Sequence, residues 1–534
     1  MPVYSFLNGI DPRLTSHGAM VVIFMLLAAI ALRFISPGAW AKPATRVLAI
    51  LLGALAVFQL LFACGYFFYP RYIDWMEPMV IATSWIGWRG GNFYPSLAGG
   101  DMMGNWYGPL LYQSYGFFLW LFGPSIGSSK ILGVAAFVGE QFATLWMLKR
   151  AGAIRGEALV LTSIQCLLQA GFNGQGIAFG ARADALLMLA AVLGMIVATS
   201  PVNFVNAAIL GAAMGVAANL KIHGVFYLVP AFFLFVSQAD DNLARFKLAL
   251  VTGAAALASL ALPFAAESVS LARYVDLFGL TRHHGFSKWV LEKNLIFLAM
   301  LWSPLLLLYG LFRPKLPAAL VWLAAACVPA MAVVTVSGSV LGSGHYNLLS
   351  FIPAMAWAVV VLLDAIRRQG RGGKAEDRLA TACLCMIAAF LAGFAPLLLT
   401  GWRDVLHQYS DAPLVRQALA DIDGQMKRNP GLSLEIGPGP LHDLRVIPVF
   451  RGSPLPIDAE AWADLMTGGV SEALPRRTIE TCRVDYWLMP ATGPFFYDPA
   501  SPIFGPEFPA FFRAHYRKDE AGAIFDRWRC AAKG

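Results

Sequence analysis

Apolar residues along this chain gather into long runs instead of alternating with polar ones. Runs of about 20 residues, the length of helix that crosses ~30 Å of hydrocarbon, recur from residue 18 to residue 400 and then stop. The pattern predicts a mainly α-helical, polytopic membrane protein with about twelve transmembrane helices. We expect the spans at about 17–35, 46–68, 128–149, 156–172, 182–199, 204–220, 224–238, 245–264, 293–312, 316–336, 347–365 and 378–400.

The composition supports a membrane protein and argues against a nucleic-acid-binding protein. Hydrophobic residues make up 58% of the 534 positions and charged residues 13%, against about a quarter in soluble proteins. The net charge of +8 does not indicate a nucleic-acid site, because basic residues flanking spans set membrane topology. We expect the first apolar run to be a retained helix, since no small-x-small cleavage site follows it closely.

Basic residues mark alternate connections between the spans. By the positive-inside rule these connections face the cytoplasm, and the other set, with the tail from 401, faces outward. We expect a multi-pass membrane protein with this orientation. The basic clusters are Lys42/Arg46, Lys149/Arg150/Arg155, Arg245/Lys247, Arg313/Lys315 and Arg367/Arg368/Arg371/Lys374/Arg378.

Two outward segments predict helices at the membrane surface. The loop 69–127 contains "YGPLLYQSYGFFLWLFG", an aromatic run too short to span comfortably, and 265–292 mixes apolar and basic positions. The short spans 204–220 and 224–238 meet at "LKIHG", which predicts a helix break beside Lys221.

The chain divides into two parts near residue 400. Residues 1–400 are expected to form the transmembrane part, and 401–534 a small extracytoplasmic α/β domain. A disulfide between Cys482 and Cys530 is plausible in an oxidising compartment. The other five cysteines are interpreted as buried thiols.

Candidate chemistry begins with "YIDWMEP", just outside the second span. Asp74 and Glu77 are three residues apart, so on a helical turn they would share one face. Such carboxylates could serve as a general base, ligate a divalent metal through oxygen, or cap a helix. The spacing does not choose among these three uses.

The order of motifs resembles a known family. "DWMEP", "GNFYP", "YGPLLYQSYGFFLWLFGPSIGSSKILG", "RADALLMLAAVLG", "ANLKIHGVFYLVPA" and "GSGHYNLLSFIPAMAW" together resemble GT-C class integral-membrane glycosyltransferases. The specific likeness is to the family related to protein O-mannosyltransferases and lipid A aminoarabinose transferases. It implies a multi-pass protein of the bacterial inner membrane with a GT-C-like fold. It also implies transfer of a sugar from a polyprenyl-phosphate carrier outside the membrane, with an outer-loop acid that corresponds to Asp74. Met76 and Pro78 replace two glycines of the family motif, and Pro78 is expected to turn Glu77 away from its family orientation.

A lipid-phosphate donor requires positive groups near the membrane surface. Lys221 with His223 at the helix break, and Arg282 in "LTRHHG", are candidates for phosphate contact. His345, Tyr346 and Asn347 at the start of a late span are candidates for hydroxyl recognition, and Asp101 for a second acid. Arg182 and Asp184 are expected to satisfy each other.

The sequence therefore predicts an inverting glycosyltransferase with Asp74 and Glu77 as catalytic residues. Its expected partners are a polyprenyl-phosphate sugar donor, the lipid bilayer and an extracytoplasmic acceptor, which could be a lipid, a glycan or a protein. No cofactor is indicated beyond a possible divalent metal. A secondary transporter and a membrane glycan polymerase or ligase are the alternatives.

Overall fold

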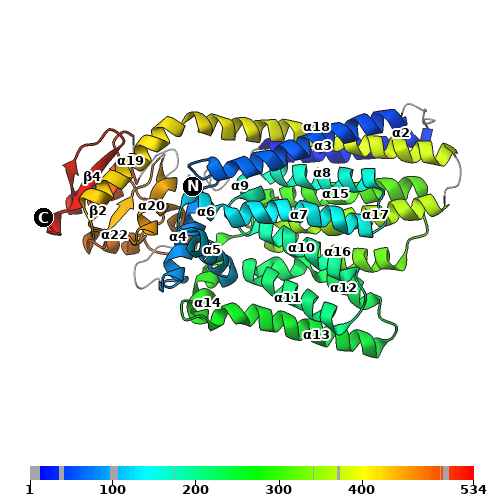
Figure 1. The fold of residues 1–534 in the computed structure, drawn as a ribbon, viewed down its shortest axis with the longest axis horizontal. Helices are drawn as coiled ribbons and strands as arrows, with labels where there is room; N and C mark the ends of the chain where they lie inside the picture. Colours follow the sequence, from blue (N-terminus) through cyan, green and yellow to red (C-terminus); the bar gives the residue numbers. More distant parts are fainter. Residues whose placement is uncertain are drawn as a thin grey trace.

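A bundle of roughly parallel helices makes up most of the molecule, and a small domain sits at one end of it (Figure 1). The computed structural model describes residues 12–34, 41–96, 106–173, 175–340, 342–369, 373–439, 441–493, 495–496 and 504–533. The main bundle helices are α2 (Pro12–Phe34), α3 (Ala41–Gly65), α7 (Ile131–Arg150), α8 (Arg155–Asn173), α10 (Asp184–Ala198), α11 (Phe204–Leu220), α12 (Val229–Ser237), α13 (Asn242–Ala261), α15 (Lys288–Phe312), α16 (Ala318–Ser337), α17 (Ile352–Gln369) and α18 (Gly373–Ser410).

Each predicted span coincides with one of these helices. Seven helical stretches in the described residues are long and apolar enough to cross a membrane, and four more apolar helices are shorter. The remaining predicted span, 156–172, coincides with α8, which carries two glutamines, Gln165 and Gln169. The last span extends further than expected, because α18 continues past residue 400 to Ser410 and leads into α19 (Ala412–Arg428).

The predicted helix break at "LKIHG" is confirmed. Helix α11 ends at Leu220, Lys221 is extended with φ −143° and ψ 142°, and the 3₁₀ helix η3 (Ile222–Tyr227) leads into α12. Gly224 makes the tight return possible, because a Cβ there would lie 1.9 Å from the Ala217 carbonyl oxygen. Because the helix ends there, the Lys221 side chain can reach Asp184 at the start of α10.

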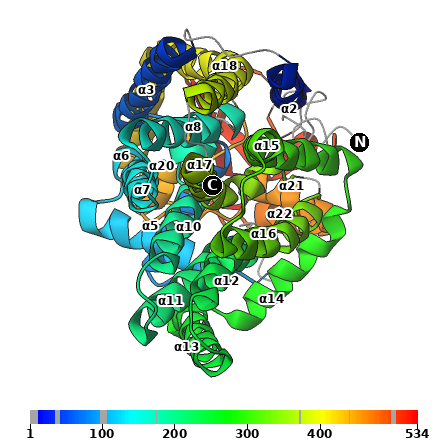
Figure 2. The ribbon, with the colours of Figure 1, turned by 90° about the vertical axis from the view of Figure 1, so that its right-hand side faces the viewer.

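Helix α17 runs through the middle of the bundle. Of the apolar window in His345–Gln369, 89% is buried inside the protein, more than in the other long helices. An end-on view places α17 near the centre, with α3 and α18 at one edge and α11 and α13 at the opposite edge (Figure 2). The 3₁₀ helix η6 (His345–Phe351) precedes α17, so Asn347 enters the same interior.

Short helices from the loop 69–127 cover one end of the bundle (Figure 1). They are α4 (Met76–Trp88), α5 (Pro109–Phe122) and α6 (Ile126–Ser129), and α5 is the helix expected from the aromatic run. Helix α5 lies close on α4 because Gly116 has no side chain; a Cβ there would be 2.8 Å from the Ser84 carbonyl oxygen. The helix expected within 265–292 is α14 (Leu271–Leu280).

The C-terminal domain is α/β, as predicted. Its four-stranded mixed sheet has the order β1-β2-β4-β3, with β1 parallel to β2 and the other pairs antiparallel. Cys482 and Cys530 form a disulfide with a Cα–Cα distance of 5.9 Å, which confirms that pairing. The remaining elements are β1 (Leu434–Ile436), η7 (His442–Arg445), α20 (Val446–Phe450), α21 (Ala459–Thr467), α22 (Ala473–Glu480), β2 (Tyr486–Pro490), α23 (Phe508–His515), β3 (Tyr516–Glu520) and β4 (Phe525–Cys530).

The domain and the basic clusters lie at opposite ends of the bundle. Arg71 of the first loop pairs with Asp443 of the domain at 2.8 Å, which fixes the domain over the end that carries α4. At the other end, Lys42 pairs with Asp377 at 3.0 Å and Arg367 with Glu157 at 2.6 Å. We refer to these as the domain end and the basic end.

Candidate functional site

Asp74 stands in a turn that connects the second span to α4. Its Oδ1 accepts the Met76 backbone N–H, the first N–H of α4, at 2.8 Å. Nη1 of Arg182 lies 3.1 Å from Oδ1 and 3.0 Å from Oδ2. Gly176 allows this approach, because a Cβ there would meet the Asp74 side chain at 2.4 Å. Asp74 therefore faces the interior of the bundle end, toward a cation.

The ion pair continues into a chain of alternating charges. Arg182 Nε donates to Asp184 Oδ2 at 3.2 Å, and Lys221 Nζ donates to Asp184 Oδ1 at 2.6 Å. The side chains are 3% to 14% exposed. We call Asp74, Arg182, Asp184 and Lys221 the charge chain. Two acids and two bases balance, and each buried charge depends on its neighbours because an unpaired one would be costly.

Aromatic and amide groups surround the two cations of the charge chain. The Tyr346 ring centre is 4.9 Å from Lys221 Nζ and 5.6 Å from the Arg182 guanidinium carbon, distances typical of cation–π contact. Asn347 Oδ1 lies 3.4 Å from Lys221 Nζ, and His223 lies beside Asn347. The structure thus brings together five of the candidate residues, Asp74, Lys221, His223, Tyr346 and Asn347.

Glu77 is fully buried and has a different environment. Its Oε1 accepts from the Tyr66 hydroxyl at 2.8 Å and from the backbone N–H groups of Ile73 and Asp74 at 3.2 and 3.0 Å. Its Oε2 accepts the Ala181 N–H at 2.7 Å. One carboxylate therefore ties the Asp74 turn to the segment before Arg182. Glu77 and Pro78 both stand in the first turn of α4, where a proline costs no helical hydrogen bond.

Burial has a measurable consequence for Glu77. Desolvation, reinforced by the negative charge of Asp74, raises the pKa of Glu77 to about 7, against opposing hydrogen bonds from the Ala181 and Asp74 N–H groups. A carboxyl group whose pKa is higher in the folded than in the unfolded protein stabilises the fold most at low pH, where it is protonated in both states. We therefore expect the difference in melting temperature, wild type minus Glu77→Gln, to decrease as the pH rises from about 4.5 to about 7. Above about pH 7 the difference should stay constant. A difference that rises across this window would contradict the account.

Lys130 was not predicted as a site residue, and the structure places it beneath the turn that contains Asp74. Its buried Nζ donates to the carbonyl oxygens of Tyr69 and Arg71, both at 2.6 Å, and lies 3.8 Å from the centre of the Tyr66 ring. It thereby holds the turn that presents Asp74. A lysine alone in an apolar run was the available signal, because such a residue must find a partner.

The other three candidate residues are His345, whose side chain the structure describes, and Arg282 and Asp101, whose side chains it does not. His345 is buried in η6 with its ring 5.5 Å from the Phe297 ring. Arg282 belongs to the short helix η5 (Thr281–His284), and its side chain is outside the described part of the structure. Asp101 lies outside the described residues. In the described residues, no three His, Cys, Asp or Glu side chains gather in a metal-ligand arrangement.

The expectation for Arg182 and Asp184 was incomplete. They do pair, but each also contacts a charge that is distant in sequence, Asp74 or Lys221. The arrangement is a connected, buried set of charged groups at the start of α10 and the end of α11. It can bind an anion through its cations and accept a proton through its acids.

Comparison with known proteins defines the class of fold. No protein-family model and no curated protein matches the chain. Solved structures do match, and they show that the chain has the ArnT-like fold of GT-C glycosyltransferases.

Two of the similar structures are crystal structures of ArnT from Cupriavidus metallidurans. The form bound to undecaprenyl phosphate has 14% identity and a TM-score of 0.54, with 90% of this chain and 97% of that chain covered. The apo form has 14% identity and a TM-score of 0.52, with coverage of 90% and 96%. An oligosaccharyltransferase from Archaeoglobus fulgidus matches at 12% identity and a TM-score of 0.36, with 90% and 72% covered.

Proposed function

We propose that the protein is a membrane glycosyltransferase that moves a sugar from a polyprenyl-phosphate carrier to an extracytoplasmic acceptor. The observation that carries the proposal is the charge chain, in which Asp74 and two cations meet at the domain end of a GT-C-like bundle. The ArnT structure of the same fold contains undecaprenyl phosphate, which supports a lipid phosphate as the ligand here.

Lys221 and Arg182 are the groups proposed to hold the donor phosphate. Both are paired with acids that a phosphate could replace as partner, and Lys221 Nζ also has the Tyr346 ring and Asn347 beside it. Hydrogen bonds to a phosphate strengthen as negative charge develops on the leaving oxygen. The two cations therefore favour departure of the polyprenyl phosphate.

Asp74 is proposed as the general base. In the resting arrangement Arg182 lies against both of its oxygens, which leaves little of the carboxylate for a substrate. When the donor phosphate draws Arg182 toward itself, an oxygen of Asp74 becomes available to the acceptor. The acceptor hydroxyl or amine loses its proton to Asp74 and attacks the anomeric carbon, while the bond from that carbon to the phosphate oxygen breaks.

Glu77 and Lys130 are proposed to position Asp74 and to take no part in proton transfer. Both oxygens of Glu77 already accept hydrogen bonds from the protein, and Lys130 Nζ is used by backbone carbonyls. The predicted catalytic pair thus divides into one base and one residue that holds it in place.

The site is proposed to face outward. The basic clusters lie at the opposite end of the bundle, as the positive-inside rule requires of a cytoplasmic end. The disulfide of the C-terminal domain fits an oxidising compartment. A secondary transporter with the same span count is disfavoured by the ArnT-like fold and by a charge chain at one end of the bundle, since transporter sites lie near the bilayer midplane.

The stereochemistry of the product tests the mechanism. A single displacement by the acceptor inverts the anomeric carbon, so the product should carry the configuration opposite to that of the donor. NMR of the product made by the reconstituted protein from a polyprenyl-phosphate sugar of known anomer measures this. Retention would indicate a covalent sugar intermediate and would exclude Asp74 as a base in a single step.

A further inference from the structure

A cavity of about 620 Å³ extends along the bundle from Arg46 and Arg367 at the basic end to Ile352, the first residue of α17. Helices α3, α8, α15, α17 and α18 enclose it, and α17 contributes Ile352, Met355, Ala356, Val359 and Leu363. These positions recur every three or four residues, so one face of α17 forms its wall. The size lies within the ~300–1,000 Å³ typical of ligand pockets.

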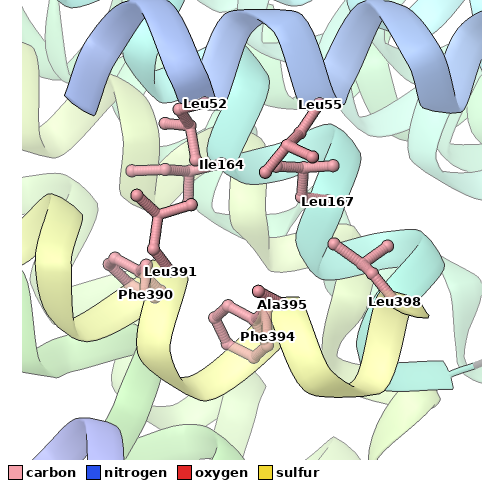
Figure 3. Close-up of a pocket in the computed structure, with 9 residues that line it drawn as sticks. All are labelled: Leu52, Leu55, Ile164, Leu167, Phe390, Leu391, Phe394, Ala395 and Leu398. Carbon is pink, nitrogen blue, oxygen red and sulfur yellow. The ribbon is translucent and has the colours of Figure 1, made fainter. Parts of the chain in front are cut away.

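Most residues that line the cavity are apolar. Ile164 and Phe390 line it and also line a second space of about 10 Å³, enclosed only by apolar side chains of α3, α8 and α18 (Figure 3). Water does not fill apolar cavities favourably, because each molecule needs polar partners. A hydrocarbon chain suits these walls.

The charged lining residues all lie at the basic end of the cavity. Arg367 is neutralised by Glu157 at 2.6 Å, and Lys42 lies 3.4 Å from Glu376 and 3.0 Å from Asp377. Arg46 is exposed and has no ion pair among the described residues. Arg46 is therefore the charged lining residue that lacks an ion pair in the described part of the chain, and a phosphodiester would supply its partner.

We infer that the cavity binds a glycerophospholipid of net charge −1 from the leaflet at the basic end. An acyl chain lies along the face of α17, and the phosphodiester contacts Arg46. This lipid is separate from the proposed sugar donor, because the charge chain lies at the other end of the bundle. The site is therefore a lipid-binding site in addition to the proposed catalytic centre.

Native mass spectrometry of the purified full-length protein tests the inference, with phosphatidylglycerol and phosphatidylethanolamine as probes. Ala356→Trp places an indole in the cavity and should reduce bound phosphatidylglycerol roughly tenfold or more, because the ring displaces several methylene groups of the acyl chain from the apolar cavity. Val359→Phe is a milder variant of the same kind. Leu61→Trp, on a residue that is 66% exposed on α3, adds the same ring outside the cavity and should retain wild-type binding.

Arg46→Gln tests the headgroup contact. The wild type should bind more phosphatidylglycerol than phosphatidylethanolamine. In Arg46→Gln the ratio of the two bound lipids should fall about fivefold. The inference is overturned if the two cavity variants bind as much phosphatidylglycerol as Leu61→Trp. It is equally overturned if they lose a polyprenyl phosphate instead, or if Arg46→Gln leaves the headgroup preference unchanged. Transfer activity is measured separately, so failure of the proposed function would not affect these readings.

Discussion

Replacing Asp74 by Asn is expected to lower the rate of sugar transfer by about 10²–10⁴-fold, because a positioned general base contributes about that much. Asparagine keeps the shape of the side chain and can still accept the Met76 N–H, but it cannot take a proton from the acceptor. The fold should survive. Arg182 keeps its contact with Asp184 at 3.2 Å, and the lost charged hydrogen bond costs about 2 kcal/mol of unfolding free energy.

A matched variant separates the base from a general effect of charge. Asp404 lies near the end of α18, and its exposed side chain pairs with Arg403 at 3.1 Å. Asp404→Asn makes the same chemical change at the domain end and should transfer sugar at the wild-type rate. Initial rates in proteoliposomes, with thermal unfolding recorded for each variant, give the comparison. A folded Asp74→Asn protein with wild-type turnover would remove Asp74 from the mechanism.

Lys221→Met is expected to damage both the fold and donor binding. Lys221 pairs with buried Asp184 at 2.6 Å, and removal of one partner from such a pair costs about 3 kcal/mol or more. Adding Asp184→Asn removes the uncompensated charge and should recover most of the lost stability. The double variant should still transfer sugar at least about 10²-fold more slowly, because a cation on the leaving phosphate is missing.

Asp184→Asn alone is the control for the double variant, since it differs only in retaining Lys221. We expect most of the loss to appear between these two proteins, chiefly as a higher KM for the donor. Rates over a range of donor concentrations, together with unfolding midpoints, distinguish the structural part from the catalytic part. Equal kinetics for the two proteins would show that Lys221 serves only to neutralise Asp184.

Helix positions could be predicted well from the sequence because each span is a long apolar run. The break at Lys221 could also be predicted, since a lysine and a glycine interrupt two short runs. The same rarity of charge in apolar surroundings pointed to Asp74 and Lys221. These are local signals, and a single sequence contains them.

The partners of those charges could not be predicted, because they depend on how helices pack. Arg182 meets Asp74 across 108 positions, and Lys221 meets Asp184 across 37. The local spacing of Arg182 and Asp184 indicated only that they could pair with each other. For Glu77 the decisive contact is with a backbone N–H at Ala181, a group that every residue but proline carries. Side-chain identity therefore gave no sign of its positioning role.

The most direct test of the central claim is to measure polyprenyl-phosphate-linked sugars in membranes by mass spectrometry. Three strains of the native organism are compared: one with the wild-type protein, one with Asp74→Asn, and one without the gene. The account predicts that one lipid-linked sugar accumulates equally in the last two strains and stays low in the first. The same pool in all three strains would contradict the claim that this protein consumes a polyprenyl-phosphate sugar through Asp74.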